Sequence, residues 1–323
     1  MGSEILLLGV DGGGTGCRAR LTDAAGMLLG EGKAGPANVR ISLDESLQSV
    51  LGAARQCFAK AGATLDDPVV ACLALAGASE PGDAAAAYTA FRDFFDRVVI
   101  TTDARAACVG AHAGHDGGII IVGTGTIGWA LHGDREHRVG GWGFPVSDEG
   151  GGAWLGCEAV RRVLWAHDGR AAWTPLLREV SEELGVAPAA IVRWMGRSKP
   201  RDFGRLAPLI VQHAARKDPA ACELMRLAGS HIDAIASRLI GDGAPRLALM
   251  GGLARAIEPW LSPEMRMRLV PPSGNALNGA LRIACEAAGL DAGGVSHLDA
   301  ASVQKYERPA ERSDAVTSGA DSA

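Results

Sequence analysis

The chain opens with short apolar runs separated by turns rich in glycine and threonine. Residues 5–10 (ILLLGV) form the first run, and a Gly/Thr turn at 11–16 (DGGGTG) follows. Residues 17–23 (CRARLTD) and 28–33 (LLGEGK) give two further runs on either side of a second turn. Such runs, bounded by glycine-rich turns, are typical of β-hairpins. The pattern therefore predicts a three-stranded β-meander.

The same order of elements recurs later in the chain. Residues 119–122 (IIIV), 123–126 (GTGT), 127–132 (IGWALH) and 137–139 (HRV) again read as strand, Gly/Thr turn, strand and strand. Two unrelated β-meanders can share this pattern by chance, but helical sequence follows both copies. We therefore interpret the chain as an internal repeat of two halves.

Alternating strands and helices fill the rest of each half and predict an α/β fold. The first half is expected to contain helix 43–61, strand 68–77, helix 83–95, strand 97–103 and helix 104–112. The second is expected to contain helix 149–167, a helical insertion at about 170–241, strands 246–250 and 267–270, and helix 276–289. Two such halves suit a nucleotide in the cleft between them, with one Gly/Thr loop on each side of its phosphates.

A dinucleotide fingerprint, Gly123-x-Gly125-x-x-Gly128, lies within the second repeat. That motif binds a pyrophosphate only when its last glycine opens a helix. Here a short β-like run and the turn pair Gly133-Asp134 follow instead, so we predict a hairpin. Its glycines let backbone N–H groups approach a phosphate, and its threonines add hydroxyl donors.

Composition narrows the function further. Lys and Arg total 32 against 37 Asp and Glu, with no basic block, so nucleic acid is not an expected partner. The seven cysteines show no metal-ligand spacing and read as reduced core thiols. The apolar run 5–10 is too short for a signal peptide, and no run approaches membrane-spanning length. These features predict a cytoplasmic protein that acts on small molecules and does not bind membranes.

Seven motifs, taken in order, resemble the N-acetylglucosamine/glucosamine kinase group of the actin-like ATPase and sugar kinase superfamily, with the BadF/BadG/BcrA/BcrD-type ATPase fold. They are GVDGGGTGCRARL (9–21), GPAN (35–38), LALAGA (73–78), TTDA (101–104), GTGT (123–126), GGWGFPVSDEGGGAWLG (140–156) and LMGGLA (249–254). The likeness covers about residues 5–288. It is strongest to bacterial glucosamine kinases, which share CRARL and DGRAAWTPL (168–176).

The resemblance implies two ribonuclease H-like domains, at 1–117 and 118–290, with nucleotide and sugar in the cleft between them. We expect residues 291–323 to be a disordered tail, because they are polar and poor in apolar residues. The resemblance leaves a homodimer open.

The family's nucleotide site implies ATP and Mg²⁺ as cofactors. The two Gly/Thr loops hold the phosphates and a Gly-Gly turn lies against the adenosine. The matching positions are Gly12, Gly13, Gly14, Thr15, Gly123, Thr124, Gly125, Thr126, Gly251 and Gly252. Asp11 stands where the family places an aspartate near Mg²⁺ and the phosphates. A turn-initiating aspartate is the alternative for that position.

The family's catalytic position falls on Asp103, whose carboxylate would accept the sugar hydroxyl proton during phosphoryl transfer. Its alternative role is a helix N-cap, and the two roles are compatible. The sugar-side positions are Asn38, Asp103, Trp142, Gly143 and Asp148. We expect Glu149 to begin a helix and leave it out of the site. His112 and His115 read as surface histidines.

The resemblance implies an ATP-dependent kinase that converts glucosamine to glucosamine 6-phosphate. The pair Trp142-Gly143 departs from this pattern, because glucosamine kinases carry a charged residue after the Gly-Gly pair. It matches N-acetylglucosamine kinases, which are therefore the alternative. Two further alternatives are an ATPase activator subunit, whose cysteines would hold an iron–sulfur cluster between subunits, and a non-catalytic sugar-sensing module.

Overall fold

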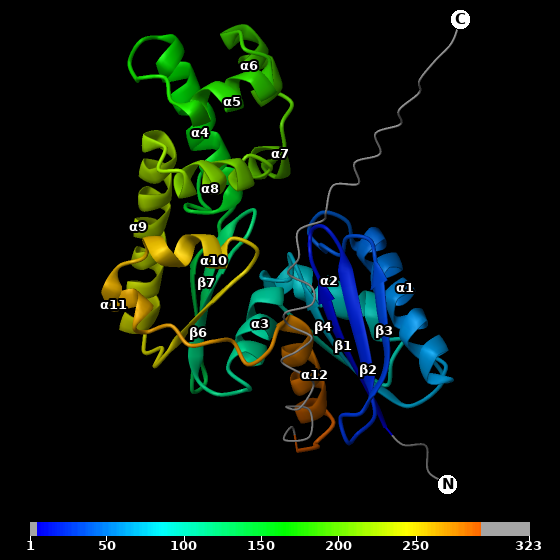
Figure 1. The fold of residues 1–323 in the computed structure, drawn as a ribbon. Helices are drawn as coiled ribbons and strands as arrows, with labels where there is room; N and C mark the ends of the chain where they lie inside the picture. Colours follow the sequence, from blue (N-terminus) through cyan, green and yellow to red (C-terminus); the bar gives the residue numbers. More distant parts are fainter. Residues whose placement is uncertain (1–4, 292–323) are drawn as a thin grey trace, which may run out of the picture.

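The computed structural model describes residues 5–291, so most of the predicted tail lies outside the described residues. Within this range the chain forms two mixed sheets, each covered by helices (Figure 1). We call each sheet with its own covering helices a lobe. The first lobe has strand order β3-β2-β1-β4-β5 and the second β8-β7-β6-β9. None of the helices in this range is long and apolar enough to cross a membrane.

The elements of the first lobe follow the predicted order closely. They are β1 (Leu6–Gly12), β2 (Cys17–Thr22), β3 (Leu28–Ala34), α1 (Leu43–Ala61), β4 (Val69–Leu75), α2 (Pro81–Phe91), β5 (Arg97–Thr101) and α3 (Asp103–Ala111). β1 pairs antiparallel with β2 and parallel with β4. The carboxyl ends of β1, β4 and β5 therefore meet at one edge of the sheet, where ligands bind in open α/β folds.

The second lobe repeats the plan around a large helical insertion. Its elements are β6 (Gly117–Val122), β7 (Thr126–His132), β8 (Arg135–Gly140), α4 (Gly152–His167), α5 (Pro175–Leu184), α6 (Pro188–Met195), α7 (Pro200–Gly204), α8 (Ala207–Ala215), α9 (Pro219–Gly241), β9 (Leu247–Met250), α10 (Ala254–Ile257), η1 (Glu258–Trp260) and α11 (Pro263–Arg266). The last helix, α12 (Ala276–Ala287), packs on β1 of the first sheet. The antiparallel pairing of β6 with β7, through Val122 and Thr126, confirms the predicted GTGT hairpin.

The predicted strand 267–270 is wrong. Leu269 makes an isolated parallel bridge to Leu247 in β9, supported by two backbone hydrogen bonds. Pro271 and Pro272 follow immediately, and proline has no N–H to continue a ladder. The segment therefore occupies the place that β5 holds in the first lobe without extending the sheet as a strand.

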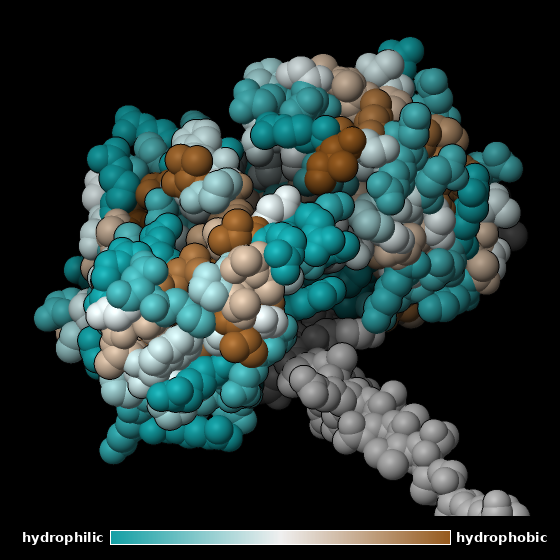
Figure 2. Space-filling model, turned by 90° about the horizontal axis from the view of Figure 1, so that it is seen from above, coloured by the Kyte–Doolittle hydropathy of each residue, from teal (hydrophilic) through white to brown (hydrophobic). Residues whose placement is uncertain are grey.

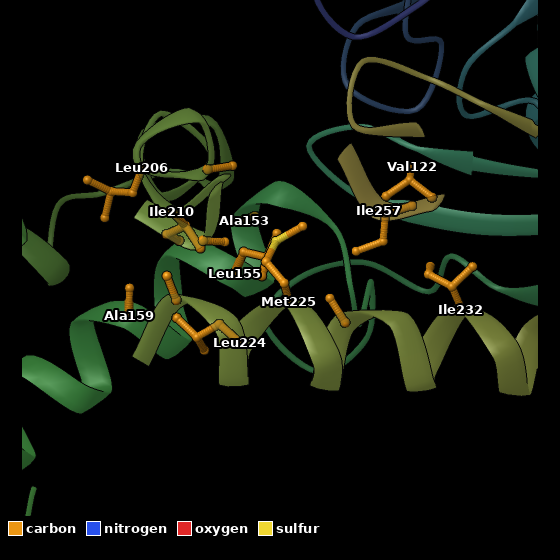
Figure 3. Packing of buried hydrophobic residues seen from close by; sticks show 14 of the residues in the cluster. Val122, Ala153, Leu155, Ala159, Leu206, Ile210, Leu224, Met225, Ile232 and Ile257 are labelled. Carbon is orange, nitrogen blue, oxygen red and sulfur yellow. The ribbon is translucent and has the colours of Figure 1, made fainter. Parts of the chain in front are cut away.

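Successive side chains of a strand point to opposite faces of its sheet. The hydrophobic core is accordingly divided into three clusters. Leu8 and Val10 of β1 face α1 and α2, whereas Leu7 faces the opposite way, toward α3 and α12. In the second lobe, Ile120 and Val122 of β6 face the helical insertion. Figure 3 shows side chains of α4, α8 and α9 converging in that cluster, among them Leu155, Ile210, Leu224 and Met225.

Helices α3 and α12 lie side by side between the two sheets (Figure 1). Their backbones are in direct contact: a Cβ atom at Gly279 would lie 1.8 Å from the carbonyl oxygen of Ala106, and one at Gly110 would lie 2.0 Å from that of Asn275. The cluster around them draws residues from both lobes, including Leu7 from β1 and Ile119 from β6. This helix pair therefore joins the two lobes.

Candidate active site

Two glycine-rich hairpins lie at corresponding places on the two sheets. Residues 13–16 join β1 to β2, and a hydrogen bond from the Gly13 N–H to the Gly16 carbonyl (2.9 Å) closes the turn. Residues 123–125 join β6 to β7, and the Gly123 N–H donates to the Gly125 carbonyl at the same distance. Figure 2 shows the surface hollowed between the two lobes.

The space around the hairpins shows which glycines are needed for internal packing. A Cβ atom at Gly12 would lie 2.7 Å from the Leu75 side chain, so that glycine is needed for internal packing. Cβ atoms at Gly14 and Gly123 would meet nothing within 4 Å. Glycine at these two positions leaves no side chain in the way of a ligand that approaches the loop backbone, as phosphate-binding loops require.

Helix α4 begins against the second hairpin. The N–H groups of Gly152 and Ala153 donate to the carbonyls of Gly123 and Thr124, both at 2.8 Å. The partial positive charge of the helix N-terminus therefore lies at the hairpin, where it favours an anion. Glu149 was predicted to begin this helix, which is wrong: α4 starts at Gly152, because the preceding segment forms a turn.

The Gly251-Gly252 turn packs on the second hairpin from the β9 side. Gly251 has φ +95°, and a Cβ atom there would lie 2.4 Å from the Val122 carbonyl oxygen. The Leu253 N–H donates to that same oxygen at 3.0 Å. The structure therefore brings the predicted adenosine-side turn next to the predicted phosphate hairpin. Gly252 itself is exposed.

Asp103 is the first residue of α3, and only Thr102 separates it from the end of β5. The N-cap is Thr102, whose hydroxyl oxygen accepts the Arg105 N–H at 3.0 Å. The predicted role of Asp103 as N-cap is therefore wrong, because Thr102 caps the helix. The Asp103 carboxylate accepts a local hydrogen bond from the Ala104 N–H at 2.8 Å.

The surroundings of Asp103 raise the pKa of its carboxyl group above the usual 3.8. Burial is the largest cause, because a desolvated carboxylate loses hydration. The negative charge of Asp11 raises the pKa further, whereas the Ala104 N–H and the positive charge of Arg138 lower it. Asp11 on the first lobe and Arg138 on the second thus both act on Asp103.

Asp11 is the penultimate residue of β1, beside the first hairpin, and forms an ion pair with Arg18 of β2. The Arg18 Nη2 lies 2.5 Å from the Asp11 Oδ2 atom, and the two residues face each other in the strand register. Both side chains retain exposure, 39% for Arg18 and 15% for Asp11. Arg18 was not predicted as a site residue, although its antiparallel register with Asp11 was implied by the short turn between them.

The loop after β8 is held in an unusual backbone conformation. Gly140, Gly141 and Asp148 all have φ near +68°, which is rare for the aspartate. Arg138, also missed by sequence reasoning, donates from Nε to the Gly140 carbonyl at 3.1 Å and from Nη2 to that of Gly141. Its guanidinium also lies 4.1 Å from the ring centroid of Trp142, which is 72% exposed. This stacking presents the indole to solvent.

Asp148 connects this loop to the second hairpin. The Gly143 N–H donates to its Oδ1 at 3.4 Å, and its Oδ2 lies 2.4 Å from where a Cβ atom of Gly125 would stand. Burial raises the pKa of the Asp148 carboxyl, while backbone N–H groups of Gly143, Thr126 and Phe144 lower it. The predicted site residues Gly125, Gly143 and Asp148 therefore lie next to one another.

Asn38 lies beside the carboxyl end of β4, where it pairs with Ala76. Its Oδ1 accepts the Arg40 and Ile41 N–H groups, an Asx turn that fixes the side chain. A Cβ atom at Gly77 would lie 2.5 Å from that oxygen, so the two segments pack tightly.

The predicted surface position of His112 is wrong, whereas His115 is exposed as expected. His112 is buried, and its Nε2 lies 2.8 Å from the Gly118 carbonyl oxygen. Gly117 makes this possible, because a Cβ atom there would lie 2.5 Å from the imidazole ring. Burial lowers the pKa of His112, which keeps the ring neutral. This histidine is part of the packing between α3 and β6.

Comparison with known proteins identifies the family that carries this arrangement. Residues 8–284 match the BadF/BadG/BcrA/BcrD ATPase family. The chain belongs to this ATPase family. Membership confirms the predicted use of ATP and the predicted two-lobed α/β fold.

Proteins similar to this ATPase family member in sequence or structure include several that are named as kinases. The chain is 39% identical over 279 residues to glucosamine kinase GspK of Vibrio cholerae, covering 86% of this chain and 95% of the relative. It is 29% identical over 182 residues to the N-acetylmuramic acid/N-acetylglucosamine kinase of Clostridium acetobutylicum, covering 55% and 60%. A crystal structure from Chromobacterium violaceum, provisionally named an N-acetylglucosamine kinase, has a TM-score of 0.80 at 39% identity over 87% of this chain and 99% of that one. The chain is accordingly an ATP-dependent kinase.

Proposed function

We propose that the protein transfers the γ-phosphoryl group of ATP to the 6-hydroxyl of glucosamine, giving glucosamine 6-phosphate. The observation that carries this proposal is the 39% identity to the Vibrio cholerae glucosamine kinase along 95% of that enzyme's length. The geometry supports it, because glycine-rich hairpins lie at corresponding places on the two sheets and Asp103 is a desolvated carboxylate on which charges from both lobes act. An amino sugar and ATP are the two substrates.

Asp103 is the proposed catalytic base. It accepts the proton of the 6-hydroxyl as the sugar oxygen attacks the γ-phosphorus in line, and ADP leaves. The raised pKa of Asp103 makes it a stronger proton acceptor than an ordinary aspartate. The hairpin N–H groups hold the phosphates, and the helix dipole of α4 adds positive potential beside the second hairpin.

Mg²⁺ is the proposed metal cofactor, with Asp11 as its protein ligand. Across residues 5–291 no group of three His, Cys, Asp or Glu side chains is close enough to form a metal cage. A single partly exposed carboxylate beside an open phosphate loop nevertheless fits this ion. Mg²⁺ keeps several waters and is commonly held by one or two carboxylates together with substrate phosphates. When bound, the ion neutralises phosphate charge.

N-acetylglucosamine is the second candidate substrate, and the residue that favours it is Trp142. The exposed indole offers an apolar face to an acetyl methyl group, and Arg138 fixes its orientation. The provisional name of the Chromobacterium violaceum structure supports this candidate. Asn38, Asp103, Gly143 and Asp148 remain the proposed partners of the sugar hydroxyls in either case.

An activator subunit of the same fold is less compatible with the cysteines. An iron–sulfur cluster shared between subunits needs exposed thiolates. Five of the cysteines are buried, among them Cys17, Cys57, Cys72 and Cys108. Burial raises the pKa of each of these four thiols to about 12, so the thiolate form is disfavoured.

A coupled ADP-release assay across glucosamine, N-acetylglucosamine, glucose and N-acetylmuramic acid tests the proposal. Glucosamine should give the highest kcat/KM. A kcat/KM for N-acetylglucosamine at least equal to that for glucosamine would replace the first candidate with the second. Turnover of none of the four sugars, in protein shown to bind ATP, would remove the amino-sugar kinase proposal itself.

A further inference from the structure

Three aromatic rings join the loop after β8 to the helical insertion. The Phe144 ring of the loop packs on the Phe203 ring of α7, with 5.2 Å between the ring centroids and 42° between the ring planes. The Trp194 ring of α6 meets Phe203 edge-on, with 4.8 Å between the centroids. Phe203 is therefore the middle ring, and it is 5% exposed. Aromatic pairs at these separations are attractive beyond the area that they bury.

Phe144 is the residue that ties the loop to the insertion. Of residues 142–146, only Phe144 is not exposed, and it packs against the hydrophobic core of the second lobe. Trp142 is 72% exposed and Val146 is 90% exposed. The Trp142 N–H donates to the Ser147 hydroxyl at 3.3 Å, which closes the base of the loop without reaching the insertion. The place of the loop relative to α7 therefore depends on the Phe144 ring.

The other side of α7 contacts the elements that form the second hairpin. A Cβ atom at Gly156 of α4 would lie 2.0 Å from the Phe203 carbonyl oxygen, so the two helices pack backbone against backbone. A Cβ atom at Gly204, the last residue of α7, would lie 3.5 Å from the Thr124 Cγ2 atom of the hairpin. Phe203 thus projects from a helix that is fixed against α4 and the hairpin through its backbone.

We propose that Phe203 is a positioning residue for sugar binding, which acts through Phe144. The two rings hold the loop that carries Trp142, Gly143 and Asp148 at a fixed place relative to the second hairpin. This inference rests on the proposed function, which places the sugar at that loop. Removing the Phe203 ring leaves the backbone contacts of α7 in place, so its loss should weaken the binding of the sugar and not that of ATP.

Steady-state ADP release tests this, with the KM for the sugar measured at saturating ATP and the KM for ATP at saturating sugar. The sugar is whichever of glucosamine and N-acetylglucosamine the wild type phosphorylates. Phe144→Leu and Phe203→Leu should each raise the KM for the sugar about 3- to 10-fold, the size of an aromatic pair's contribution, and leave the KM for ATP unchanged. The double variant should show no more than the larger single change, because both substitutions remove the same contact. Phe144→Tyr keeps the ring and should retain the wild-type KM.

The matched control is Phe95→Leu, the same change at a phenylalanine that is 6% exposed in the core of the first lobe. It should leave both KM values unchanged.

A role in packing alone predicts a different pattern. The fold-changes of Phe144→Leu and Phe203→Leu would then multiply in the double variant, or the KM values for sugar and ATP would rise alike. Either pattern overturns the inference, and so does a wild-type KM for the sugar in Phe144→Leu. If Phe203→Leu does not fold, the two Phe144 variants decide, because that side chain is only half-buried. Wild-type protein that phosphorylates neither sugar would overturn the proposed function, and this inference with it.

Discussion

Replacing Asp103 with asparagine separates its chemical role from any structural one. Thr102 caps α3, so the helix start does not depend on the Asp103 side chain. Asparagine also keeps a side-chain oxygen that can accept the Ala104 N–H, as the carboxylate does. The substitution therefore removes the negative charge and the proton-accepting group, and it keeps the helix cap and the hydrogen bond to Ala104.

The expected loss of turnover follows from the proposed role as base. General-base help is worth about 10²- to 10⁴-fold, or roughly 3–5 kcal/mol of barrier. We expect kcat of Asp103→Asn to fall in that range in the ADP-release assay, while the Kd for ATP changes little. A kcat near that of the wild type in folded Asp103→Asn protein would refute the assignment of Asp103 as the base.

The thermal stability of Asp103→Asn should rise, although its turnover falls. Because burial raises the pKa of Asp103 in the folded protein, the folded state binds this proton more tightly than the unfolded chain does. Its contribution to stability is therefore lost as pH rises above the usual 3.8, and it is unfavourable at neutral pH. Asp103→Asn should melt at a higher temperature than the wild type at pH 8, with a smaller difference at pH 5. A lower Tm at pH 8 would contradict this reasoning.

Three further substitutions test the surroundings of the site. Arg138→Gln should move the acid limb of the kcat/KM profile to higher pH, because the positive charge of Arg138 lowers the pKa of Asp103; an unchanged limb would contradict it. Thr102→Ala should lower the free energy of unfolding by about 1 kcal/mol in urea, whereas Thr102→Ser should not. Gly279→Ala should destabilise the protein by about 1–3 kcal/mol through overpacking against Ala106. Its control, Gly82→Ala in open space on α2, should stabilise by about 0.5–1 kcal/mol; equal effects of the two would refute the packing argument.

The local elements were predictable because their signals lie within a few residues. Both hairpins follow from glycine between short apolar runs, and α1 has the bounds that its apolar periodicity predicts. The errors arise where distant segments decide the outcome. His112 is buried because Gly117 of β6 admits its ring, and residues 267–270 form one bridge because prolines end their pairing.

The family resemblance supplied the residues of the candidate site but not the charges that act on them. The resemblance named Asp11 and Asp103, yet the arginines that act on them were missed. Arg18 could have been found from its place opposite Asp11 across the short turn. Arg138 could not, because its approach to Trp142 and its effect on Asp103 depend on the left-handed bend at Gly140 and Gly141.

The contact between β1 and α12 has a consequence for how the chain folds as it is synthesised. Gly9 of β1 packs directly on Leu281, and Arg97 reaches the carbonyl of Ala287, 190 residues further along. One face of the first sheet, with Leu7 and its neighbours, is therefore covered only in part, by α3, until α12 leaves the ribosome. Domains commonly fold in order as they emerge. Here the half that is made first is completed last, so α12 must emerge before Asp103 stands on a fully packed helix.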